Sequence, residues 1–222
     1  MSGYTDALIS VFSDAQDANK AIAQERYMKN KFPFFGISSP DRKRLQAPFL
    51  VKKYLPTKKE AYAIAEELWQ KPQRELHYFS MELIQKYKTQ MEVDDIIFFE
   101  WLLTHNSWWD TVDLIASNLV GYYFIKYPEM RDKTIEKWLR SDHIWLQRTC
   151  LIFQLKYRDK TDVLMLSNCI EYLIGTKEFF INKAIGWALR QFSRENPIWV
   201  EEFVEQHPNM SQLSKREALR LI

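Results

Sequence analysis

Residues 108–122 read WWDTVDLIASNLVGY, and three other stretches of the chain align with them without gaps. They are QRELHYFSMELIQKY at 73–87, QRTCLIFQLKYRDKT at 147–161 and GWALRQFSRENPIWV at 186–200. In this alignment equivalent positions lie 35, 39 and 39 residues apart. A helical pattern that recurs at this period is typical of stacked antiparallel helix pairs. The sequence therefore predicts an all-α solenoid.

Composition agrees with this class. The 222 residues suit one domain, 1–222, and include only five Gly, so strands bounded by Gly turns are not indicated. The formal net charge is +2, which is nearly neutral. Any affinity for nucleic acid must then come from local placement of charge.

The sequence shows no sign of secretion or membrane insertion, and its two cysteines suit a reducing compartment. The first residues, MSGYTDALIS, lack a basic stretch followed by an apolar run, and no apolar run reaches membrane-spanning length. Cys150 and Cys169 both lie in apolar helical stretches, as core thiols of a protein in a reducing cytosol do. We therefore expect a cytoplasmic protein that does not bind membranes.

Helix boundaries are marked by polar caps, Pro and short connections. Ser38 and Ser39 offer N-caps to a helix whose first residue is Pro40. The predicted helices are a pair over 4–28, then 41–55, 57–71, 73–89, 93–105, 108–127, 129–140, 143–157, 162–174, 178–194, 197–206 and one after 209.

One column of the alignment carries Trp and Arg. Arg74, Trp109, Arg148 and Trp187 occupy it, about 160° around the helix from the apolar column that starts at Leu76. Arginine is rarely buried without a partner. We therefore expect this column to line an accessible surface.

Asp113 is four residues after Trp109 and so lies on the same helix face. A structural interpretation is a salt bridge to Arg148 of the following repeat; a functional one is a reactive carboxylate oriented by that arginine. Asp110 suits a first-turn position. Gly186, directly before Trp187, indicates close approach either of a ligand or of a packed neighbour.

Two indoles, a carboxylate and an arginine suit the stabilisation of positive charge. No zinc-ligand spacing and no nucleotide-binding motif is present, so we expect neither metal nor cofactor. Lys183, Arg190 and Arg194 surround Trp187 and could meet a DNA backbone. A second basic group is either a solvated face or a phosphate contact. Its members are Arg42, Lys43, Arg44, Lys52, Lys53, Lys58 and Lys59.

Four segments resemble the bacterial AlkD-type DNA alkylation repair proteins. They are NSWWDTVD at 106–113, KAIGWALR at 183–190, QR at 147–148, and Tyr27 followed by FFGISSPDR. The resemblance covers nearly the whole chain. It implies about six HEAT-like helix pairs that curve around duplex DNA with a concave binding face.

The resemblance also implies a monofunctional DNA glycosylase that removes cationic N3- and N7-alkylpurines in base excision repair. By matching position, Asp113, Trp109 and Trp187 would be the catalytic residues. Arg148 would contact the backbone near the lesion, and Tyr27 would touch the DNA nearby. The enzyme would act as a monomer in the bacterial cytoplasm, on the nucleoid.

Two other functions stay open on the sequence. One is a non-catalytic HEAT-repeat binder of damaged or branched DNA, which would be expected to lose the Trp–Asp–Trp set that this chain keeps. The other is a protein-binding scaffold, whose groove would show no salt-sensitive affinity for DNA.

Overall fold

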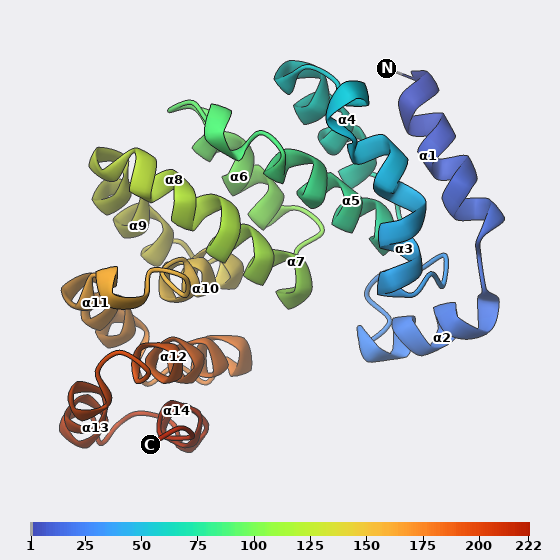
Figure 1. Cartoon of the computed structure of the whole chain (residues 1–222). Helices are drawn as coiled ribbons and strands as arrows, with labels where there is room; N and C mark the ends of the chain where they lie inside the picture. The colour runs from blue at the N-terminus through green and yellow to red at the C-terminus, as the bar shows by residue number, and fades with distance from the viewer. Residues whose placement is uncertain (1) are drawn as a thin grey trace. The chain divides into compact units, whose positions relative to one another are not determined.

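The computed structural model describes residues 2–222, with side chains from residue 3 onward, and every regular element in that range is helical (Figure 1). The prediction of an all-α chain is confirmed. Contacts divide the chain into two compact units, Met1–Met91 and Glu92–Ile222, which we describe separately. No helix in the described range is long and apolar enough to cross a membrane.

The first unit has five α-helices and three short 3-10 turns in its described part. They are α1 (Ser2–Asp14), α2 (Ala18–Tyr27), α3 (Ser39–Gln46), η1 (Ala47–Leu50), η2 (Lys52–Tyr54), α4 (Lys58–Trp69), α5 (Arg74–Gln85) and η3 (Lys88–Gln90). Apolar side chains of α1, α4 and α5 form the core, with Phe12, Leu68 and Phe79 fully buried in it. The loop before α3 is fixed to α5, because the buried Glu75 carboxylate accepts hydrogen bonds from the backbone N–H groups of residues 35–37.

The predicted helix 41–55 was wrong beyond residue 46. Ser38 caps α3 as expected, its hydroxyl accepting a 3.3 Å hydrogen bond from the Asp41 N–H. Pro48 then has no N–H to donate to the carbonyl four residues earlier, so the α-helical hydrogen-bond pattern cannot continue through it. The chain therefore leaves the α-helix and continues as η1 and η2.

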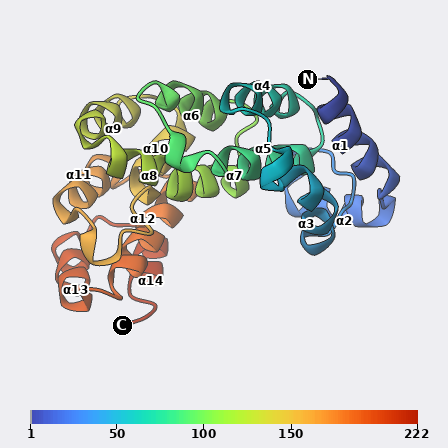
Figure 2. The ribbon, with the colours of Figure 1, turned by 45° about the horizontal axis from the view of Figure 1, so that its top comes forward.

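The second unit is a succession of helix pairs, which two views show from different sides (Figures 1 and 2). Its α-helices are α6 (Asp95–Thr104), α7 (Trp109–Leu114), α8 (Gly121–Lys126), α9 (Arg131–Leu139), α10 (Ile144–Ile152), α11 (Val163–Leu173), α12 (Phe179–Phe192), α13 (Pro197–Gln206) and α14 (Gln212–Ala218). Short turns η5 (Pro128–Met130) and η6 (Arg158–Lys160) join some of them. Cys150 and Cys169 are buried free thiols in this core, as predicted.

The helix predicted over 108–127 contains a wider turn. The π-helical segment η4 (Ile115–Val120) joins α7 to α8 without a break in the helical path. Such turns insert a residue into the helix and recur near functional sites. Here the segment begins two residues after Asp113, and the Ser117 hydroxyl donates a 2.7 Å hydrogen bond to the Asp113 carbonyl.

The repeat has a different register from the one in the sequence alignment. Helices α5, α7, α10 and α12 begin at Arg74, Trp109, Ile144 and Phe179, at a constant interval of 35 residues. The two offsets of 39 residues in the sequence alignment were therefore wrong, each too long by four residues, or about one helical turn. A slip of four residues rotates a helix by only about 40°, so apolar residues stay on the buried face in either register.

Candidate functional site

Asp113 and Arg148 form a two-point ion pair within the second unit. Arg148 of α10 donates from Nε to Asp113 Oδ1 at 2.7 Å and from Nη2 to Oδ2 at 2.9 Å. Its Nη1 donates to the Phe180 carbonyl oxygen on α12 at 2.5 Å. One guanidinium thus joins α7, α10 and α12, and the salt bridge expected between Asp113 and Arg148 is present.

The two partners differ in exposure. The Arg148 side chain is 4% exposed and that of Asp113 is 17% exposed, so the carboxylate is the member that solvent or a ligand reaches. Burial raises the pKa of Asp113 above its ordinary value, and the negative charge of Asp110 raises it further. The hydrogen bonds and charge of Arg148 oppose this rise. The contacts with Arg148 favour the ionised carboxylate, and burial leaves it poorly hydrated.

The expectation that the arginines of the Trp and Arg column line a surface was wrong. Arg74 is fully buried, with its guanidinium carbon 3.8 Å from the centre of the Phe32 ring and Nη1 2.9 Å from His77 Nδ1. Arg148 is 3% exposed. Arginine tolerates such burial because protein groups replace the water around it. A phosphate contact by Arg148 stays a prediction; in the structure its three nitrogens serve protein acceptors.

The two predicted indoles are both half-buried. Trp109 is the first residue of α7, so Asp113 follows it by one turn on the same side of the helix. Trp187 lies on α12, the helix whose first turn holds the carbonyl that accepts from Arg148. The set of Trp109, Asp113 and Trp187 therefore comes from two helices that Arg148 connects.

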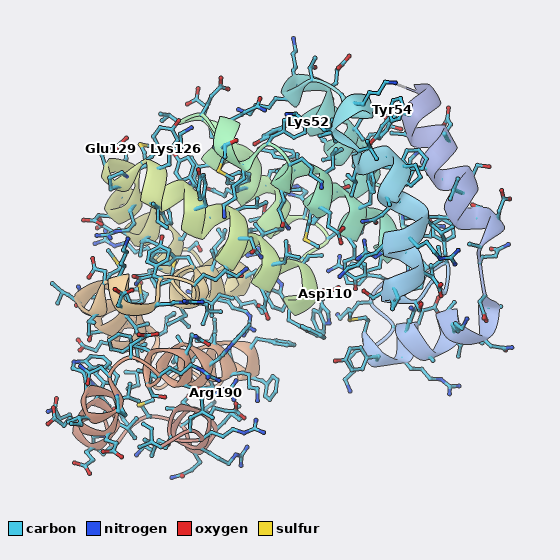
Figure 3. All side chains as sticks on the ribbon, viewed as in Figure 1. Lys52, Tyr54, Asp110, Lys126, Glu129 and Arg190 are labelled. Atoms are coloured by element: carbon cyan, nitrogen blue, oxygen red, sulfur yellow. The ribbon has the colours of Figure 1, made fainter. Side chains whose placement is uncertain are left out.

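The two predicted DNA-binding cations on α12 share one acidic partner. Glu217 of α14 accepts from Lys183 Nζ at 2.7 Å and from Arg190 Nη1 at 2.6 Å. These two cations hold the pKa of Glu217 below its ordinary value, Lys183 most of all. Lys183, Arg190 and Glu217 together carry a net charge of +1, and the two cations lie on the same helix as Trp187. Figure 3 shows Arg190 on α12 and Asp110 at the start of α7.

Gly186 has a packing role. A Cβ added there would lie 2.5 Å from Glu217 Cβ and 2.8 Å from the Ser214 carbonyl oxygen. Helix α14, which carries Ser214 and Glu217, packs against α12 (Figure 1). Of the two interpretations of Gly186, the structure favours the packed neighbour over the ligand.

An aromatic cluster behind the ion pair escaped the sequence analysis. The Phe180 ring centre lies 5.0 Å from that of Trp108 and 5.0 Å from that of Trp145, and the two indoles are 5.5 Å apart. This cluster fixes the backbone of Phe180, whose carbonyl accepts from Arg148. The Phe-Phe pair at the start of α12 was a possible signal, but only the 35-residue register brings it next to residue 148.

The remaining predicted site residue, Tyr27, and the N-terminal basic group belong to the first unit. Tyr27 ends α2 in the first unit and is 68% exposed, and its contact with DNA stays a prediction. The N-terminal basic group is not one surface: Arg42 is buried and bonded to Glu82 at 2.9 Å, and Arg44 pairs with Asp41. Its lysines at 52 and 53 are exposed, and Figure 3 shows Lys52.

Several solved structures are similar to this chain over most of its length. A solved structure described as a predicted DNA alkylation repair enzyme from Enterococcus faecalis is 29% identical, with a TM-score of 0.86 over 93% of this chain and 96% of that one. AlkD2 from Streptococcus mutans is 13% identical, with a TM-score of 0.63 over 84% and 91%. The smu.31 protein from Streptococcus mutans UA159 is 16% identical, with a TM-score of 0.60 over 82% and 97%. The last two show a shared fold alone.

No curated protein matches the sequence. The family model of the DNA alkylation repair enzymes matches residues 8–222, which is nearly the whole chain. This match and the structural likeness agree with the four sequence segments that resemble AlkD-type proteins. The chain belongs to the DNA alkylation repair enzyme family.

Proposed function

We propose that the chain is a monofunctional DNA glycosylase that hydrolyses the N-glycosidic bond of cationic N3- and N7-alkylated purines in duplex DNA. The observation that carries the proposal is the Asp113 carboxylate, 17% exposed and fixed by two hydrogen bonds from Arg148. It is a poorly hydrated negative charge of fixed direction, one turn from an indole. Family membership implies DNA as the partner.

The substrate class follows from what the site has to do. An alkylated purine already carries positive charge, so its bond to C1′ can break with the electron pair leaving on the base and without a proton donor. Positive charge then develops on the deoxyribose, as in other glycosyl transfers. The Asp113 carboxylate stabilises that charge and orients a water molecule whose oxygen attacks C1′, and the water proton passes to the carboxylate or to solvent.

Trp109 and Trp187 hold the cationic nucleotide. The face of an indole attracts cations with about 0.5–2 kcal/mol, depending on how far the pair is desolvated. Both side chains are half-buried, so they offer part of their surface to a ligand while protein contacts limit their motion. We assign them to binding the damaged nucleotide and keeping its sugar beside Asp113.

Arg148 acts as a positioning residue for Asp113, because its Nε and Nη2 bonds leave the carboxylate a single orientation. Lys183 and Arg190 supply the local positive charge for DNA phosphates. We place the reaction in the bacterial cytoplasm, with the enzyme acting as a monomer on a duplex.

The test is release of free base from duplex DNA that carries N7-methylguanine, under single-turnover conditions. The wild type is compared with Asp113→Asn and with Asp110→Asn, which removes a neighbouring carboxylate. We expect release by the wild type and by Asp110→Asn, and a loss of at least a hundredfold in Asp113→Asn, in line with removal of an electrostatic catalytic group. No release by the folded wild type, with duplex binding intact, would move the assignment to a non-catalytic DNA binder.

A further inference from the structure

Helix α12 carries a row of aromatic and basic side chains on one face. Phe179, Lys183, Trp187 and Arg190 are spaced by four, four and three residues. At about 100° per residue they fall within about 80° of the helix circumference. We name these four residues the α12 row. Proteins that bind single-stranded nucleic acid combine aromatic rings with cations along the strand, and the α12 row has the same two kinds of side chain.

All four side chains of the α12 row reach the surface. Phe179 is 58% exposed, Trp187 is half-buried, and the side chains of Lys183 and Arg190 are 39% and 21% exposed. Trp187, Lys183 and Arg190 already have places in the proposed site. Phe179 is the member that neither the resemblance nor the proposed mechanism uses.

The repeat register separates Phe179 from other exposed apolar residues. Leu164 on α11 and Ile198 on α13 are even more exposed, so exposure alone carries no argument. Phe179, however, is the first residue of α12, as Trp109 is the first residue of α7, two repeats of 35 residues earlier. The two rings therefore occupy equivalent positions, each followed after four residues by a charged side chain.

The surroundings of Phe179 also connect it to the site. Its ring centre lies 5.3 Å from that of Phe180 in an edge-to-face contact. The Phe180 ring in turn packs at 5.0 Å on Trp108, the residue before Trp109, and its carbonyl oxygen accepts from Arg148. Phe179 is thus the exposed end of the aromatic cluster that supports the Asp113–Arg148 pair.

We infer that Phe179 is a third aromatic DNA contact, whose ring packs on a nucleotide about three steps from the damaged one when α12 follows the strand; this rests on the proposed function. Phe179 is eight residues before Trp187, which corresponds to about 12 Å along the helix axis. Successive nucleotides of one DNA strand rise by about 3.4 Å along the duplex. The ring therefore meets a different nucleotide from the one at Trp187.

The test compares Phe179→Ala and Phe179→Tyr with Tyr172→Ala. Tyr172 is a matched control, because it is an aromatic side chain of the same repeat, 55% exposed, on α11. Binding to fluorescein-labelled duplexes with and without N7-methylguanine is measured by anisotropy, and base release is measured separately. We expect Phe179→Ala to weaken binding about tenfold, the scale of one lost base–aromatic contact, and Phe179→Tyr and Tyr172→Ala to bind like the wild type.

Two outcomes decide the inference independently of the glycosylase reaction. If Phe179→Ala binds both duplexes as tightly as Tyr172→Ala does, the inference is wrong, whether or not the wild type releases base. If Phe179→Ala weakens binding while the wild type releases no base, the DNA contact of Phe179 is supported and the proposed glycosylase activity is wrong. The melting temperatures of Phe179→Ala and Tyr172→Ala are compared as well, and an equal, small shift assigns the weaker binding to the lost contact.

Discussion

Arg148 binds Asp113 across a separation of 35 residues, which is one repeat of the chain. Each residue is the fifth of its helix, so the ion pair joins equivalent positions of neighbouring repeats. Arg148 also donates a hydrogen bond to the Phe180 carbonyl on α12, which is the equivalent helix of the following repeat. The 35-residue period thus places the carboxylate and the guanidinium at equivalent positions of neighbouring helices, where they meet.

The first prediction concerns Arg148. In Arg148→Lys a single ammonium group replaces a two-point donor, so Asp113 loses its fixed direction although the positive charge remains. We expect base release to slow by tenfold or more, with a loss of about 1–3 kcal/mol in the free energy of unfolding, because one carboxylate oxygen and the Phe180 carbonyl lose donors. Single-turnover release and urea unfolding measure the two effects.

A double-mutant cycle separates positioning from any phosphate contact. If Arg148 acts through Asp113, then Arg148→Lys should slow release little further once Asp113 is already Asn. Losses that multiply independently would show that Arg148 acts on the DNA instead, as the sequence resemblance implies. Lys137→Gln, which breaks an exposed ion pair with Glu100, serves as the control and should leave release unchanged.

The second prediction concerns Asp113 and stability. Asn keeps one oxygen as an acceptor for Arg148, but its amide NH₂ replaces the second acceptor, so one donor of an arginine side chain that is 4% exposed loses its partner. We therefore expect Asp113→Asn to fold but to lose about 1–3 kcal/mol of unfolding free energy. The lost activity has to be measured below the lowered melting temperature. An unfolding free energy equal to that of the wild type would show that the pair contributes nothing to the fold.

The third prediction is the pH dependence of base release. The reaction needs ionised Asp113, and burial raises the pKa of that carboxyl. The rate should therefore fall with acid at a pH above the ordinary aspartate value of about 3.9. Since the charge of Asp110 also raises this pKa, Asp110→Asn should move the acid limb to lower pH. A limb that does not move in Asp110→Asn would contradict the assignment of the titration to Asp113.

The free energy of unfolding should depend on pH in opposite directions through Asp113 and through Glu217, because their pKa values shift in opposite directions. A carboxyl whose folded pKa is raised, such as Asp113, gives its full stabilisation below its unfolded pKa and loses it as pH rises through the folded value. Glu217 has a lowered pKa, so its contribution is present above its unfolded pKa and is lost as pH falls through the folded value. Acid should therefore loosen the α12–α14 contact.

The sequence was sufficient for most of the helices, though not for 47–55, and for the choice of Trp109, Asp113 and Trp187 as candidates. It was not sufficient for the register, because a slip of one turn keeps apolar residues such as Leu76 and Leu189 on a buried face. It also misplaced the arginines. Whether an Arg is at the surface or buried depends on partners such as the Phe180 carbonyl, which no local pattern reveals.

The fourth prediction concerns Gly186. In Gly186→Ala the new methyl group would lie 2.5 Å from Glu217 Cβ, so α14 has to move away from α12. We expect a loss of about 1–3 kcal/mol in unfolding free energy from this overpacking. Gly3→Ala in α1 is the control, because a Cβ there meets nothing within 4 Å. Equal unfolding free energies for the two variants would contradict close packing of α12 and α14.

The last prediction concerns the two cations that Glu217 holds. If Lys183 and Arg190 each neutralise one DNA phosphate, then Lys183→Gln and Arg190→Gln should each reduce the slope of log K against log salt by about 1. Lys133 is an exposed lysine on α9, outside the α12 row, so Lys133→Gln should leave the slope unchanged. Because Glu217 shares the charge of both cations, Glu217→Gln should leave the slope intact and tighten binding at low salt, provided that α14 stays folded. An unchanged slope in both α12 variants would show that Glu217 uses these cations only to hold α14 against α12.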